Sequence, residues 1–164
     1  MTDESNVTRL RRAVIDDPRN AQLRYLLGAE MAQERDYESA VMEWSAAIAL
    51  DPLLHVARLQ LGLLHLTMAR LDHARAVLAP LEDLDDSMAL KQFKRGLEAL
   101  IEDNFTACAA HLRAGIELNT DNPPLNADMQ MLLGKAMQAM NADAAPVGDA
   151  SIRHDFSLYS TTRH

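Results

Sequence analysis

The stretch that decides the fold is AQLRYLLGAEMAQERDYESAVMEWSAAIALDPLL, residues 21–54. Its pattern returns twice at one fixed interval, and Gly28, Gly62 and Gly96 mark the same place in each copy. The other two copies cover residues 55–88 and 89–122. Copies at intervals of about 34 residues are typical of two-helix units that stack into a solenoid. The sequence therefore predicts an all-α fold, an α-solenoid of three helix-turn-helix units.

Two further positions of the unit repeat with the glycines. The twentieth position holds small residues and the twenty-fourth holds bulky apolar ones: Ala40, Ala74 and Cys108, then Trp44, Leu78 and Leu112. A glycine or small residue where two helices cross lets their backbones approach closely, and a bulky residue opposite fills the remaining space. Asp51-Pro52 is expected to stop the second helix of the first unit, because proline cannot continue a helix.

This pattern resembles the tetratricopeptide repeat family over residues 21–122. The first unit is close to the family consensus at these positions: Leu27, Gly28, Ala40, Trp44, Ala47, Asp51 and Pro52. The third unit departs from the family pattern at three positions. It has Arg95 in place of an apolar residue, Gly115 in place of alanine and Thr120 in place of the closing proline. The resemblance implies a small protein of three repeats.

The segments outside the repeats complete the predicted domain plan. Residues 1–20 are expected to hold an N-terminal capping helix that resembles half a repeat, and residues 123–141 a C-terminal capping helix. Within the second unit, Pro80 is expected to end the helix near Ala79, because proline removes a helical hydrogen bond. The acidic run at 82–86 is interpreted as a solvated, irregular connection rather than a calcium site.

The resemblance places a binding groove along the first helices of the units. In the family these helices line a concave groove, and the matching residues here are mostly apolar: Tyr25, Ala29, Val56, Leu59, Leu63, Leu66, Leu90, Phe93, Leu97 and Leu100. Apolar residues at this spacing are also common on a helix face that is buried in the core. The sequence therefore leaves open whether these residues line a groove or belong to the core. Well-known peptide-binding members bind the C-terminal carboxylate of a peptide through lysine and asparagine at two of these positions. Tyr25 and Ala29 stand there in the first unit, so that type of clamp is not expected.

The last segment, residues 142–164, is interpreted as a linker followed by an apolar tail. Four tail residues are candidates for docking into a groove: Ile152, Phe156, Leu158 and Tyr159. A chain end is also often disordered, and the sequence does not decide between the two. If the tail docks, either its own groove or that of a neighbouring copy would receive it.

The expected function is protein–protein interaction, as an adaptor or chaperone-like binder of an apolar or amphipathic polypeptide segment. One alternative is a self-assembling structural protein, a homodimer for example, whose groove is filled by its own or a neighbour's tail. A narrower alternative is a bacterial translocator chaperone of type III secretion, which the chain resembles in size, charge and number of repeats. No residues remain for a catalytic domain, so an enzyme is not expected.

Composition narrows the choice of partners. The net charge of −8 argues against a nucleic-acid partner, which requires a basic surface. No apolar run reaches membrane-spanning length, and the polar N-terminus does not resemble a secretory signal. A single cysteine cannot form an internal disulfide, so a cytoplasmic location is expected.

The histidines and the single cysteine do not form the sequence pattern of a catalytic, cofactor-binding or metal-binding site. His55, His65, His73 and His111 do not pair at metal-ligand spacing, and no cofactor or metal is expected. His65 is interpreted as a hydrogen-bonded core residue. Cys108 takes the place of Ala40 and Ala74 in the other units, so its size explains it better than a nucleophilic role would.

Overall fold

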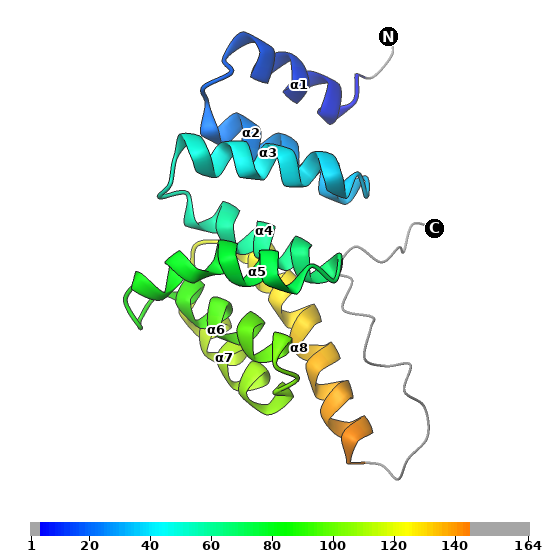
Figure 1. Ribbon diagram of the computed structural model, residues 1–164, viewed down its shortest axis with the longest axis vertical. Coiled ribbons are helices and arrows are strands. Elements are labelled where there is room, and N and C mark those ends of the chain that lie inside the picture. The colour runs from blue at the N-terminus through cyan, green and yellow to red at the C-terminus, as the bar shows by residue number, and fades with distance from the viewer. Residues whose placement is uncertain (1–3, 145–164) are drawn as a thin grey trace.

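The structure is a computed structural model that describes residues 4–144, and this part of the chain is helical throughout apart from short connections (Figure 1). The α-helices are α1 Asn6–Asp16, α2 Ala21–Gln33, α3 Tyr37–Leu50, α4 His55–Thr67, α5 Leu71–Leu78, α6 Ala89–Ile101, α7 Phe105–Leu118 and α8 Pro123–Asp143. A 3-10 helix, η1 Ala79–Asp83, follows α5. Helices that are neighbours in sequence pack against each other, α2 on α3, α4 on α5 and α6 on α7. The architecture is consistent with a helical repeat array.

The helix boundaries repeat with the sequence. The first helices of the units begin at Ala21, His55 and Ala89, and the second helices begin at Tyr37, Leu71 and Phe105. All six starts therefore keep the interval that separates Gly28 from Gly62 and Gly62 from Gly96. The predicted all-α class agrees with the observed helices.

The turn between the two helices of each unit has the same backbone geometry. Arg35, Ala69 and Asp103 adopt positive φ angles of 65°, 56° and 55°. The same hydrogen bond then closes each first helix: Asp36 N–H to the Met31 carbonyl at 2.9 Å, Arg70 to His65 at 2.8 Å, and Asn104 to Ala99 at 2.8 Å. These are the features of a Schellman motif, in which the residue with positive φ is usually glycine. Non-glycine residues carry some strain here, so packing of the paired helices must hold the turn.

The contact between paired helices is made where the sequence predicts it. A Cβ atom added to Gly28 would lie 2.6 Å from the Trp44 ring, and one added to Gly62 would lie 2.5 Å from Leu78. The third pair, Gly96 and Leu112, would approach to 2.9 Å. Because real Cβ contacts are longer than this, only glycine permits the observed helix spacing.

The connection after α5 agrees with the effect expected of Pro80. Helix α5 ends at Leu78, and the chain continues as the 3-10 helix η1 from Ala79. The acidic residues of the run at 82–86 are exposed, as interpreted, but carboxylates of this run also form ion pairs with α6. The capping helices are present as well: α1 spans Asn6–Asp16, and α8 is longer than expected at Pro123–Asp143.

Two apolar clusters fill the array and meet at α4. The N-terminal cluster joins α1, α2 and α3 to Leu61 and Leu64 of α4. The C-terminal cluster joins Leu59 and Leu63 of α4 to α5, η1, α6, α7 and α8. Helix α4 therefore contributes different faces to the two clusters and links them.

Candidate functional site

The predicted groove residues divide into two groups in the structure. Five of them are buried: Leu59, Leu63, Phe93, Leu97 and Leu100, with exposures of 0, 1, 0, 0 and 7 %. The other five are partly exposed: Tyr25, Ala29, Val56, Leu66 and Leu90. The expectation of one open apolar groove along all three units was therefore wrong for the buried five. We call the face formed by these five residues the trough.

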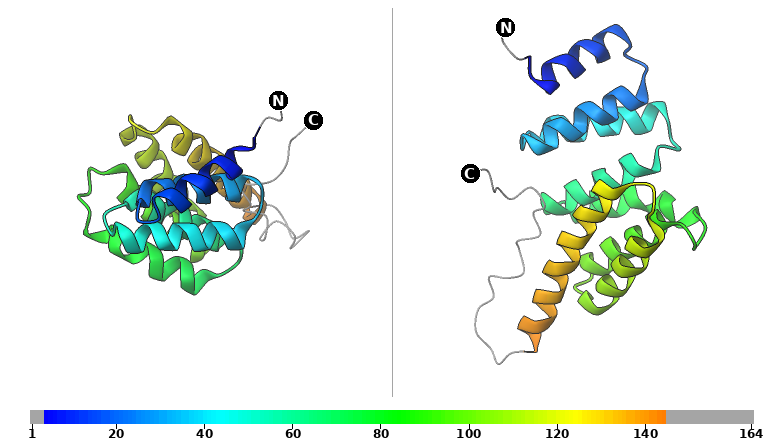
Figure 2. Two further views of the ribbon diagram at one scale, coloured as in Figure 1. Left: turned by 90° about the horizontal axis from the view of Figure 1, so that it is seen from above. Right: turned by 180° about the vertical axis from the view of Figure 1, so that it is seen from behind.

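Helix α8 packs on α7 and belongs to the cluster that buries the trough. Its apolar side chains belong to the same cluster as the trough residues: Leu125, Met129, Leu132, Ala136 and Ala139. In both Figure 1 and Figure 2, α8 runs steeply to α2 and α4 instead of continuing their direction. It therefore does not stack as a further first helix, and its main packing partner is α7.

One polar contact shows how far α8 reaches along the array. Asp128 of α8 accepts a hydrogen bond from Gln60 of α4, and burial raises the pKa of this carboxyl above its usual value. Burial, and then the charge of Asp128, raise the pKa of Tyr25 on α2. The start of α8 thus contacts the second unit through Asp128.

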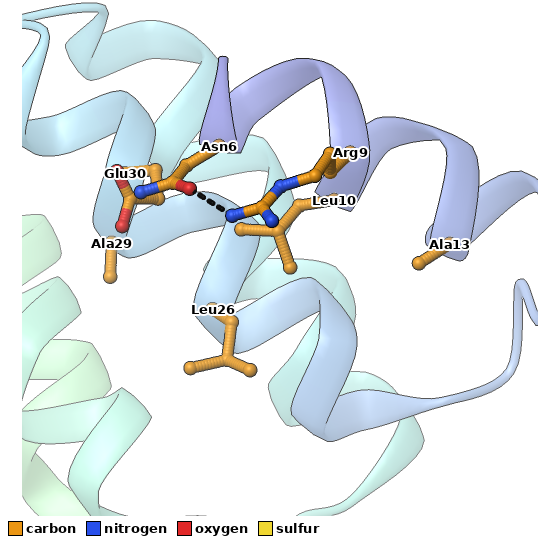
Figure 3. A pocket seen from close by; sticks show the side chains of 7 residues that line it. All are labelled: Asn6, Arg9, Leu10, Ala13, Leu26, Ala29 and Glu30. Atoms are coloured by element: carbon orange, nitrogen blue, oxygen red, sulfur yellow. Dashed lines mark hydrogen bonds between the residues drawn. The ribbon is translucent and has the colours of Figure 1, made fainter. Parts of the chain in front are cut away.

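The first unit keeps an open apolar cleft, between α1 and α2 (Figure 3). It has a volume of about 490 Å³ and is lined by Asn6, Arg9, Leu10, Ala13, Leu26, Ala29 and Glu30. Leu26 is 41 % exposed beside the apolar side chains of the cleft. Tyr25 lies one turn from Ala29 on α2, but it does not line the cleft. We call this site the α1–α2 cleft.

Polar groups lie at the edge of this cleft. Arg9 donates a hydrogen bond to the Asn6 side chain within α1, and Glu30 stands opposite on α2 (Figure 3). Helix α1 carries Arg9, Arg11 and Arg12, whereas the whole chain has a net charge of −8. The cleft is therefore lined mainly by apolar side chains. The basic helix α1 borders it on one side, and Glu30 of α2 is the single acidic residue in its lining.

The sequence interpretation placed only Ala29 of the cleft in a binding surface. Leu26 was missed because its position is not among those that line the groove in the family. A signal was nevertheless present, since the equivalent positions in the other units are the polar residues Gln60 and Lys94. Because this position is polar in the other two units, packing of the repeat does not explain why the first unit has a leucine there.

The histidines are closer together than the sequence indicated. The rings of His65 on α4 and His73 on α5 have centroids 5.3 Å apart. His65 is buried, and its Nδ1 has no hydrogen-bond partner, so the interpretation of it as a hydrogen-bonded core residue was wrong for that atom. Burial, followed by the charges of His73 and Arg70, lowers the pKa of His65. Within residues 4–144, no three His, Cys, Asp or Glu side chains are grouped as metal ligands would be.

Cys108 is enclosed in the C-terminal cluster. Its side chain is fully buried, as expected for a residue that takes the place of alanine in the other units. Burial raises the pKa of the thiol to about 12. The thiol therefore stays protonated at neutral pH, whereas a nucleophile requires the thiolate.

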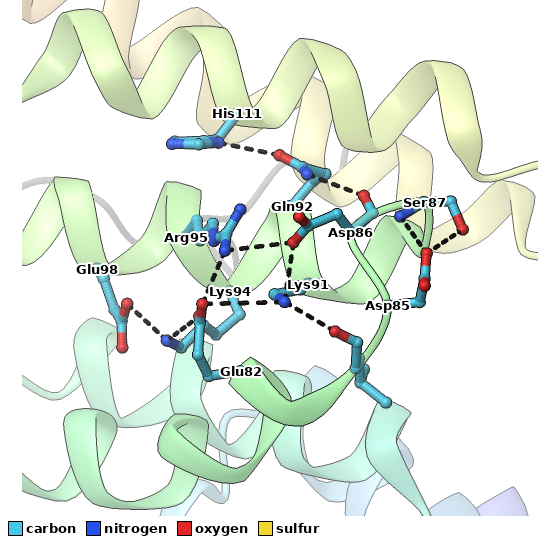
Figure 4. A network of polar contacts seen from close by, with 11 residues as sticks. Glu82, Asp85, Asp86, Ser87, Lys91, Gln92, Lys94, Arg95, Glu98 and His111 are labelled. Carbon is cyan, nitrogen blue, oxygen red and sulfur yellow. Dashed lines mark hydrogen bonds and ion pairs between the residues drawn. The ribbon is translucent and has the colours of Figure 1, made fainter.

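The densest charge cluster of the described residues joins η1 to α6 (Figure 4). Glu82 pairs with Lys94 at 2.7 Å and with Arg95 at 2.7 Å. Asp86 pairs with Lys91 at 2.8 Å, and Lys91 also donates to the Leu84 carbonyl at 2.8 Å. Each of these charges has an opposite partner within the protein, so the cluster fixes the irregular connection between the second and third units. We call it the η1–α6 clamp.

The candidate docking residues Ile152, Phe156, Leu158 and Tyr159 lie outside the described residues. Within the described part, no helix combines the length and the apolar character that crossing a membrane requires. No protein-family model and no curated protein matches this chain.

Proposed function

We propose that the protein is an adaptor or chaperone-like member of the tetratricopeptide repeat class that binds an apolar or amphipathic polypeptide segment. The observation that carries the proposal is the α1–α2 cleft. There Leu26 is 41 % exposed beside Leu10 and Ala29, whereas the trough in the second and third units is covered. An apolar surface that the fold leaves open is available to a partner.

The class assignment rests on repeated geometry rather than on a single motif. Helix starts, Schellman turns and glycine contacts all recur at the same interval along the chain. Arrays of such units present long surfaces formed by several helices, and these surfaces suit extended or helical segments of other proteins. A cytoplasmic location fits this proposal.

The size of the cleft favours a polypeptide that reaches beyond it. Burial of a side chain such as Leu26 contributes roughly 1.5–3 kcal/mol when it is complete. A specific protein interface usually involves a surface larger than one cleft of this kind, about 800 Å² on each partner. The partner would therefore insert apolar side chains into the cleft and extend along α2 toward Tyr25.

The substitution Leu26→Glu tests this proposal. We expect it to abolish capture of a polypeptide partner by the purified protein in native cell extract, because a buried carboxylate opposes apolar docking. Leu53→Glu is the matched control, since Leu53 is 75 % exposed and lies in the connection between α3 and α4. Circular dichroism checks that both variants stay folded. Recovery of the same partners by wild type and Leu26→Glu would contradict the proposal.

Self-assembly is a second candidate, favoured by exposed apolar side chains around α1 and α3. Ile15 is 77 % exposed and Met42 is 71 % exposed. Met42 also lines a smaller cleft with Arg11 and Met31. If this surface joins two copies, light scattering should show a dimer for wild type and a monomer for Met42→Glu. A monomeric wild-type protein would exclude this candidate.

A further inference from the structure

Two histidines of the second unit occupy positions where the other units have residues that carry no charge. The residues equivalent to His65 are Met31 and Ala99, and those equivalent to His73 are Ser39 and Ala107. Met31 and Ala99 are buried, as His65 is, so an apolar residue satisfies the packing at that position. Packing of the repeat therefore explains neither histidine.

The His65 ring is buried and has one nitrogen without a hydrogen bond. The residue is 6 % exposed, and its Nδ1 has no hydrogen-bond partner among residues 4–144. The ring centroid lies 5.3 Å from that of His73, an exposed residue of α5. Protonation of His65 would place a charge on a ring that has little access to water and no acceptor for the Nδ1 proton. Such a charge costs free energy in the folded state.

His65 lies where the second unit meets the first. It is in the last turn of α4, which packs on α3 of the first unit (Figure 1). Leu61, one turn before His65, belongs to the N-terminal cluster, and Met68, almost one turn after it, packs against that cluster. The His65 carbonyl also accepts the hydrogen bond from the Arg70 N–H that closes the helix, at 2.8 Å. A change at this ring therefore acts on both the end of α4 and the contact between the units.

The charges around His65 come from three elements and mostly oppose a proton. His73 lies on α5, and Arg70 in the turn before it is always cationic. The carboxylate of Glu38, at the start of α3, already pairs with the Arg70 guanidinium across the two units. Helix α6 also packs on α4, but it directs its buried Lys94 into the η1–α6 clamp.

The balance of these effects disfavours the protonated ring. The carboxyl end of a helix favours a cation, and Glu38 acts in the same direction. Burial, followed by the charges of His73 and Arg70, outweighs them and lowers the pKa of His65 below 6.5. A form in which the end of α4 is open and hydrated therefore binds this proton more readily than the closed form does. The contribution of the neutral ring to stability is complete above pH 6.5 and is lost as the pH falls toward the folded-state pKa.

We propose that His65 is an acid-sensitive joint between the first and second units, and that its protonation beside His73 and Arg70 loosens the end of α4 and its contact with α3. This inference goes beyond the proposed function and does not depend on it. Acid would then weaken the attachment of the first unit, which carries the α1–α2 cleft, while the packing of α6, α7 and α8 is retained.

Amide hydrogen exchange in the full-length chain tests the joint. The amides of Met68, Ala69 and Arg70 close the end of α4 with bonds of 3.0, 3.0 and 2.8 Å. After correction for the intrinsic effect of pH on exchange, we expect their protection to fall at least about threefold between about pH 7.5 and about pH 5. The uptake of one proton by a histidine of ordinary pKa permits a fall of at most about 30-fold over this range.

The variant His65→Met places the residue of the first unit in the second and removes the titrating ring. Its protection at these three amides should stay constant over the same pH range. His65→Ala, which places the residue of the third unit there, provides the same test if methionine does not fit. His73→Ser should reduce the fall without abolishing it, because it removes one of the two cations that oppose the proton.

Two controls separate the joint from a general effect of acid. The Asn104 amide closes the equivalent turn of the third unit, where Ala99 replaces His65, and its protection should not change with pH. His111→Gln removes a partly buried histidine on α7, whose Nδ1 lies 3.0 Å from Gln92 Oε1, and should leave the fall at the end of α4 unchanged.

An equal fall in wild type and His65→Met, no fall in wild type, or an equal fall at Asn104 would overturn the inference. Titration of the His65 ring by nuclear magnetic resonance gives a measurement that needs no variant. A midpoint at or above pH 6.5 would also overturn it, because the closed form would then bind the proton as readily as the open one.

Discussion

Gly28 shows how a single residue sets the distance between two helices. The Trp44 ring lies only 2.6 Å from where a Cβ atom of residue 28 would be, and its Nε1 donates a hydrogen bond to the Tyr25 carbonyl at 3.0 Å. The indole is therefore held on one side by α2 and fills the space beside the glycine. It cannot withdraw from an added methyl group without losing this bond or its packing.

Gly28→Ala is expected to destabilise the protein by about 1–3 kcal/mol, the usual cost of overpacking a core. Gly134→Ala is the control, because no atom lies within 4 Å of a Cβ atom built there. That change should stabilise α8 by about 0.5–1 kcal/mol, since alanine favours helix more than glycine does. Urea unfolding measures both. A neutral Gly28→Ala would mean that Trp44 moves aside easily.

At the scale of an element, the η1–α6 clamp explains why an irregular connection is well defined. Lys94 is a buried cation, and it is shared between Glu82 at 2.7 Å and Glu98 at 2.8 Å. Hydrogen bonds from Arg95 and then Lys94 lower the pKa of Glu82 to about 2. The short 3-10 helix is therefore held against α6 by charge as well as by the buried side chain of Leu81.

Glu82→Gln is expected to destabilise the protein by about 1 kcal/mol at pH 7, a small effect because Glu82 is 44 % exposed and solvent screens its charge. The folded pKa of Glu82 is below the ordinary value of 4.5, so its contribution is present above pH 4.5 and is lost as the pH falls toward 2. Wild type and variant should therefore differ by a constant amount above pH 4.5 and begin to converge in stability as the pH falls from 4.5 to 3.

The exposed Glu117 provides a control for this measurement. Glu117→Gln should leave the stability at pH 7 nearly unchanged. A stability difference between wild type and Glu82→Gln that stays constant from pH 6 to pH 3 would show that the clamp does not act through the charge of Glu82.

At the scale of the whole molecule, stability is distributed over two clusters joined through α4. The only tryptophan, Trp44, lies in the N-terminal cluster, and Leu132 lies in the C-terminal one. In a repeat array each unit is stabilised mainly by its immediate neighbours. A change in one cluster should therefore affect the other mainly through α4 and through Val77 of α5, which packs against both clusters.

Leu132→Ala is expected to cost about 2–5 kcal/mol, because it removes a fully buried side chain and leaves a cavity. Amide hydrogen exchange should show the largest loss of protection in α6, α7 and α8, with a smaller loss in α2 and α3. Trp44 fluorescence should report the N-terminal cluster separately during unfolding. Equal loss of protection in all helices would indicate a single cooperative unit instead.

The sequence anticipated much of this architecture for a physical reason. The contacts between Gly28 and Trp44 and between Gly62 and Leu78 join two helices of one unit, so the spacing along the chain fixes the geometry. The end of α5 before Pro80 is equally local, because proline acts on its own helix. Each of these features depends on residues a few turns apart.

The covering of Leu59 and Phe93 could not be predicted in the same way. Both residues occupy positions that face a groove in the family, and their apolar character suits either a groove or a core. Packing between helices decides between these, because Phe93 lies against Gly115 of α7, and α8, which begins at Pro123, belongs to the same cluster. Similarly, the sequence identified His65 as an inward-facing residue, but only packing of α5 on α4 places His73 beside it.

By itself, the sequence determined the number of repeats, the starts of their helices and the pairing of glycine with a bulky residue inside each unit, because these follow from contacts at a fixed separation along the chain. Only the tertiary structure decided which apolar face is covered and which stays open. The packing of α6, α7 and α8 into one cluster with α4 settles that question, because it joins residues that are far apart along the chain.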